Sequence, residues 1–123
     1  MKKPADIRPE FADWPNQWMG VEEDLHYGRG ILTAMRPFVE HLIAGGLKEK
    51  TIHRHLDNLW LLGGEIIRDV DTSGDYATPP LEKLRESVDP DEGPYCRHLD
   101  SESEIKSFNA TCRKLYRFLE AEP

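Results

Sequence analysis

The longest periodic run of apolar residues in the chain lies between Leu47 and Val70. Its apolar positions recur at the 3.6-residue period of an amphipathic helix, and they are Ile52, Leu56, Leu59, Ile66, Ile67 and Val70. Gly63 falls on the same stripe. Because a glycine inside a helix costs about 1 kcal/mol relative to alanine, we expect Gly63 to admit the close approach of another segment. We therefore predict that the other helices pack around this one.

Three further helices are predicted. The first covers residues 31–44, ends at Gly45 and Gly46, and is bent or shifted by Pro37. A short helix over residues 80–88 begins at two prolines, which suit a first helical turn. The last begins at Ser101, which with Glu104 has the spacing of a capping box. Its apolar stripe consists of Ile105, Phe108, Cys112, Leu115, Tyr116 and Leu119. The acidic residues 89–100 before it are expected to form a loop, with Tyr95 and Leu99 lying against the body.

Residues 1–20 differ from the rest because prolines and aromatic residues alternate there. Three prolines argue against a regular helix, whereas Phe11, Trp14 and Trp18 argue against a free tail. We expect an extended arm whose rings cover the core of an all-α domain at residues 21–123. The alternative is an aromatic patch that binds a partner.

The composition predicts one cytoplasmic domain that lacks a membrane segment, a metal and a cofactor. A chain of 123 residues can bury one core, and it has no apolar run near the length that spans a bilayer. Two cysteines are expected to be reduced thiols, with Cys112 packed as a small hydrophobe. Cys96 and His98 have no second pair of ligands nearby, as a zinc site would need.

The formal charge of −7 is distributed unevenly. Residues 64–104 carry a net charge of −8, and residues 105–123 carry +2. This excludes a uniformly basic nucleic-acid binder but leaves room for a local basic face. Such a face would use the basic residues of the second and last predicted helices, where Asn58 or Asn109 would be placed to read a base edge. The alternative is two ordinary solvated helix faces.

No catalytic motif is present. The chain lacks a glycine-rich phosphate loop, a GxSxG elbow and an HExxH pair. His53 and His55 point in different directions on a helix and cannot share a metal. We expect each histidine to be a surface or boundary residue, and the protein not to be an enzyme.

The segment from Phe38 to Gly63 resembles the first two helices of the core-binding domain of tyrosine recombinases and phage integrases. The family's turn is matched by Gly46-Leu47, and its threonine in the first turn of the next helix by Thr51-Ile52. The leucines that follow match the family's leucine-rich continuation. The last helix is similar to the family's final core-binding helix, through Arg113, Leu115, Tyr116, Phe118 and Leu119.

This resemblance implies a SAM-like four-helix bundle that grips one side of a DNA duplex. The phosphate contacts would be made by Lys50, Arg54, Arg113, Lys114 and Arg117. The family's catalytic domain has no counterpart here, Lys48 stands where a capping serine is common, and Tyr116 is not given the nucleophile's role.

Three hypotheses follow. The first is a non-enzymatic DNA-binding or recombination-accessory domain that contacts the duplex backbone through these basic faces. The second is an acidic protein–protein interaction module that uses residues 64–104. The third is a fragment of a longer recombinase.

Overall fold

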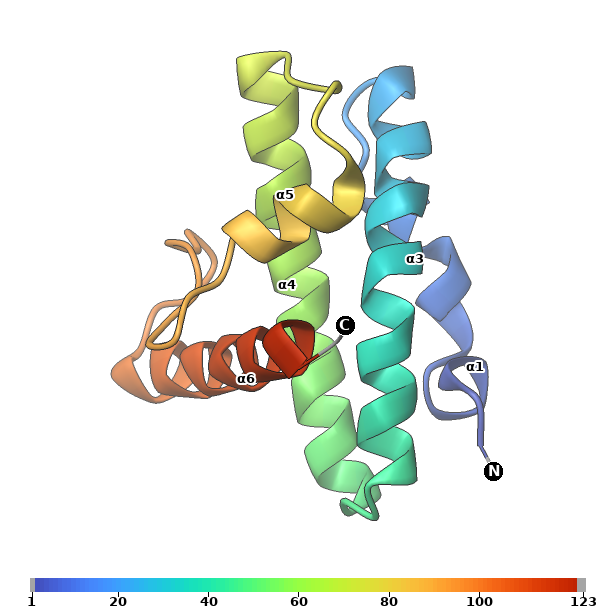
Figure 1. Cartoon of the computed structure of the whole chain (residues 1–123), viewed down its shortest axis with the longest axis vertical. Helices are drawn as coiled ribbons and strands as arrows, with labels where there is room; N and C mark the ends of the chain where they lie inside the picture. The colour runs from blue at the N-terminus through green and yellow to red at the C-terminus, as the bar shows by residue number, and fades with distance from the viewer. Residues whose placement is uncertain (1, 122–123) are drawn as a thin grey trace.

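A computed structural model describes residues 2–121 and shows only helices and loops there. Helices α3 (Glu22–Ala44) and α4 (Glu49–Ser73) run side by side in opposite directions (Figure 1). Helix α6 (Glu102–Ala121) crosses α4, and the short α5 (Pro80–Glu86) lies across α3 and α4 on the same side (Figure 1). The expected all-α class is therefore confirmed.

Helix α4 is the centre of the core, as its periodicity predicts. Leu56, Leu59, Leu62 and Val70 are fully buried on the stripe that faces α3 and α6. Most of the predicted stripe of α6 is buried, with Phe108, Cys112 and Leu115 at its centre and Leu119 near its end. Tyr116 is only partly buried, and the expectation is wrong for Ile105, which is 43% exposed. Burial of one such side chain contributes about 1.5–3 kcal/mol, so these stripes account for the packing.

The arm packs on the body as expected, but it is not extended. It is wound into α1 (Pro4–Ile7), the 3₁₀ helix η1 (Pro9–Asp13) and α2 (Trp14–Trp18). The prolines stand in the first turn of each segment, where a backbone N–H has no partner to lose. The prolines therefore separate three short helical segments instead of preventing helix formation.

The arm also explains the glycine in α4. A Cβ at Gly63 would overlap the Trp18 ring, and the Trp18 indole N–H donates to the Trp60 carbonyl at 2.9 Å. Phe11 and Trp14 are almost fully buried, so the expected core-covering role of the aromatics is confirmed for these two.

The first long helix begins nine residues earlier than the sequence predicts, at Glu22 instead of residue 31. Asp24 caps this start by accepting the backbone N–H groups of Gly20 and Val21. Gly28 and Gly30 lie inside this helix, at points where other segments pack closely against its backbone. A Cβ would lie 3.2 Å from Pro15 at Gly28 and 2.5 Å from Pro80 at Gly30.

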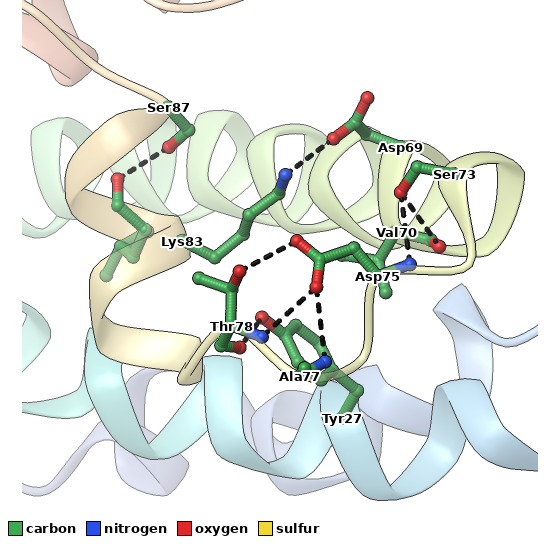
Figure 2. A network of polar contacts seen from close by, with 10 residues as sticks. Tyr27, Asp69, Val70, Ser73, Asp75, Ala77, Thr78, Lys83 and Ser87 are labelled. Carbon is green, nitrogen blue, oxygen red and sulfur yellow. Dashed lines mark hydrogen bonds and ion pairs between the residues drawn. The ribbon is translucent and has the colours of Figure 1, made fainter.

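A polar network holds the loop between α4 and α5 (Figure 2). The Asp75 carboxylate accepts from the backbone N–H groups of Ala77 and Thr78 and from the Thr78 hydroxyl. Lys83 on α5 reaches Asp69 on α4 at 2.8 Å (Figure 2). These contacts fix α5 across the helical pair.

The last helix starts as the capping box predicts. The Ser101 hydroxyl accepts the Glu104 backbone N–H at 3.1 Å, and the Glu104 carboxylate accepts the Ser101 N–H at 3.2 Å. One expectation for the preceding loop is wrong, because Tyr95 is 85% exposed instead of lying on the body. Leu99 does pack against the core.

Candidate polyanion-binding face

Hydrogen bonds between buried side chains fix the crossing of α4 and α6. The His55 Nδ1 lies 2.7 Å from the Thr111 hydroxyl. The Asn58 amide donates to the same hydroxyl at 2.8 Å and to the Ser107 hydroxyl and carbonyl at 3.1 Å each. Since buried polar groups are costly unless they are paired, this cluster favours one relative placement of the two helices.

Burial, together with the nearby charges of Arg54 and Lys114, lowers the pKa of His55 from its ordinary 6.5 to about 4. The imidazole is therefore neutral at pH 7. Arg54 precedes His55 in α4 and Lys114 follows Thr111 by about one turn of α6, so the His55–Thr111 hydrogen bond places these two cations near the same point of the crossing.

Two sequence-based expectations fail at this crossing. His55 is 5% exposed, not a surface or boundary residue, because the turn of α4 that carries it lies beneath α6. Asn58 is 6% exposed and donates its amide hydrogens to Ser107 and Thr111 of α6, so it is not placed to read a base edge. The Asn109 side-chain oxygen accepts the Gly93 N–H.

Four of the five predicted phosphate-contacting residues flank the crossing of α4 and α6, and we call them the basic face, namely Lys50, Arg54, Lys114 and Arg117. Lys50 and Arg54 are exposed and one turn apart on α4. Lys114 is half-buried and Arg117 exposed, about one turn apart on α6. None of the four forms an ion pair with another residue in the range 2–121.

Arg113, the fifth predicted residue, is engaged elsewhere. Its guanidinium donates to the Asp91 backbone carbonyl at 3.0 Å. The loop it contacts also carries Asp89 and Glu92, so Arg113 lies beside carboxylates. Arg113 lies about 100° around α6 from Lys114, and its hydrogen bond to Asp91 holds the guanidinium at the acidic loop.

The basic face offers fixed positive charge and no reactive group. Lysine and arginine donate hydrogen bonds and accept none, which suits contact with phosphate or carboxylate oxygens. Within residues 2–121, no three His, Cys, Asp or Glu side chains are grouped to hold a metal ion. In the same range no helix combines the length and apolar character needed to cross a membrane.

The cysteines are buried and lie away from this face. Cys96 is 5% exposed and Cys112 is 1% exposed, and both are free thiols. Burial raises the pKa of Cys112 to about 12, which makes its thiolate inaccessible near neutral pH. The expected packing of Cys112 as a small hydrophobe is confirmed.

No protein-family model matches the chain, and neither a curated protein nor a solved structure matches it significantly.

Proposed function

We propose that this protein is a non-enzymatic DNA-binding or recombination-accessory domain that contacts the phosphate backbone of a duplex through its basic face. The observation that carries the proposal is the His55–Thr111 hydrogen bond across the crossing, which places the turn of α4 that carries Arg54 against the turn of α6 that leads to Lys114. The resemblance to the SAM-like core-binding domain also implies phosphate contacts by these residues. That implication comes from sequence motifs and uses no distance in the structure.

The geometry favours backbone contact over base reading. The amides that would recognise a base edge are used inside the protein. Positive side chains on a rigid crossing bind phosphates without sequence preference, and such contacts weaken with salt. With four cations in contact, the logarithm of the binding constant is expected to fall against the logarithm of the salt concentration with a slope of about −3 to −4.

The test is an anisotropy titration of a labelled DNA duplex with the whole chain at low salt. We expect a dissociation constant of about 10 µM and the salt slope given above. The double substitution Arg54→Glu and Lys114→Glu should weaken binding at least about tenfold, because it reverses two phosphate contacts.

The matched control is Arg29→Glu with Arg85→Glu. Both arginines are exposed, on α3 and α5, and the change in net charge is the same. The proposal requires that the control retain substantially more affinity than the basic-face variant. Equal losses would mean that only overall charge matters, and absence of binding by the unmodified chain would refute the proposal.

A further inference from the structure

Tyr95 is the most exposed of the large hydrophobic side chains in residues 2–121. The loop that carries it is nevertheless anchored. The Asp89 carboxylate accepts the N–H groups of Asp91 and Glu92, and the Gly93 N–H donates to Asn109 on α6. Cys96 is buried on the other side of Tyr95. The Tyr95 ring is therefore exposed to solvent on a loop of fixed conformation. Exposed aromatic rings on a rigid support are typical binding anchors.

Two hollows adjoin this ring. One, of about 340 Å³, lies between α4, α5 and the loop and is lined by Glu65, Asp69 and Glu86. The other, of about 210 Å³, lies between the loop and α6, where Leu99 and Ile105 contribute apolar surface. Tyr95 lines both hollows. Ile105 is 43% exposed, so the apolar side is open to a partner.

The charge of the first hollow is negative. Lys83 is its one lining cation, and its Nζ lies 2.8 Å from the Asp69 carboxylate (Figure 2). This pairing raises the pKa of Lys83 and offsets the charge of Asp69. Glu65 and Glu86 form no ion pair with any residue in the part of the chain that the structure covers.

We propose that Tyr95, Glu65, Glu86 and Ile105 form a docking surface for a basic segment of a partner protein. An arginine or lysine of that segment enters the acidic hollow beside the Tyr95 ring, and an apolar neighbour packs on Ile105. This inference concerns a different surface from the basic face and does not depend on DNA binding.

Charge complementarity selects this occupant. A guanidinium donates two hydrogen bonds to a carboxylate and stacks on an aromatic face, and the surface offers both a carboxylate and an aromatic ring. Tyr95, Glu65 and Glu86 lie within residues 64–104, whose net charge of −8 attracts a cationic segment over a longer range. The same carboxylates repel phosphate, so a nucleic acid is a poor occupant.

The experiment measures binding of a fluorescein-labelled, amidated peptide of three Arg-Leu-Ser repeats to the whole chain by anisotropy. Two comparison peptides replace either arginine by glutamate or leucine by glycine. We expect the Arg-Leu-Ser peptide to bind most tightly, and Tyr95→Ala to weaken its binding about tenfold. Glu65→Gln with Glu86→Gln should produce a similar loss.

The charge-matched control is Glu22→Gln with Glu40→Gln, two exposed positions on α3. Circular dichroism should show that every variant keeps its helical content. The proposal is overturned if the control loses as much affinity as the Glu65 and Glu86 variant, if Tyr95→Ala binds normally, or if the peptide does not bind. Self-association that Tyr95→Ala abolishes would also overturn it, by making a second copy of the chain the occupant.

Discussion

At the residue scale, glycine placement governs how closely the arm approaches the helical body. Gly63 and Gly64 are consecutive in α4, yet only Gly63 lies too close to the Trp18 ring to carry a Cβ. A Cβ at Gly63 would overlap the ring, whereas a Cβ at Gly64 would lie 3.6 Å from Trp18 Cδ1 in ordinary contact. Trp18 is also tied to Trp60 by its indole hydrogen bond, so the ring cannot move away freely.

We therefore expect Gly63→Ala to lower the free energy of unfolding by about 2 kcal/mol, because overpacking outweighs the gain in helix propensity. Gly64→Ala should raise it by about 0.5–1 kcal/mol through propensity alone. Urea denaturation of both variants measures the difference. If the two alanines stabilise α4 equally, Trp18 does not lie against Gly63 as described.

At the element scale, the crossing of α4 and α6 depends on a buried histidine that must remain neutral. The Thr111 hydroxyl is the hydrogen-bond partner of His55, and Arg54 and Lys114 oppose protonation of the ring. The unfolded chain protonates this histidine near its ordinary value of 6.5, whereas the folded pKa is about 4. As the pH falls, His55 is therefore protonated in the unfolded chain at a higher pH than in the folded chain.

Stability contributed by this histidine is therefore present above about pH 6.5 and decreases as the pH falls toward 4. Between pH 7.5 and pH 4.5 the loss should be about 2 kcal/mol. The measurement is urea unfolding at both values for the natural chain and for His55→Asn, which cannot be charged. The variant should lose less stability over this interval, and an equal loss in both proteins would contradict the assignment.

At the scale of the whole molecule, an acidic protein carries two surfaces of opposite character. The basic face lies at the crossing of α4 and α6, and the Tyr95 surface lies between α4, α5 and the loop before α6. Arg113 stands at the boundary between them, where it contacts the acidic loop at Asp91. The excess of negative charge should thus oppose DNA binding while it favours a basic partner.

Neutralising part of that loop tests this balance. We expect Asp91→Asn with Glu92→Gln to tighten DNA binding about threefold at low salt, because repulsion beside Arg113 is reduced. The effect should shrink as salt screens the charges, and the same anisotropy titration measures it. An equal gain from Glu22→Gln with Glu40→Gln would show that overall charge, not the position of the loop, is responsible.

Local sequence patterns predicted the elements whose burial is periodic. The stripe of α4, the capping box of α6 and the stop after residue 44 all follow from interactions within a few residues. The start of α3 was missed because Gly28 and Gly30 look unfavourable in isolation, while their packing against Pro15 and Pro80 is a tertiary contact. The exposure of Tyr95 was missed for the same reason, since no local pattern shows whether a loop residue has anything to cover it.

The sequence by itself determined the helical class, the buried stripes, the cap of the last helix and the uneven distribution of charge, because these depend on neighbours along the chain. Only the tertiary structure decided which cations come together, because that depends on where two distant helices cross. The polar contacts of His55, Asn58 and Thr111 set that crossing. The crossing places the turns that carry Arg54 and Lys114 against each other, while the Arg113 guanidinium contacts the acidic loop at Asp91.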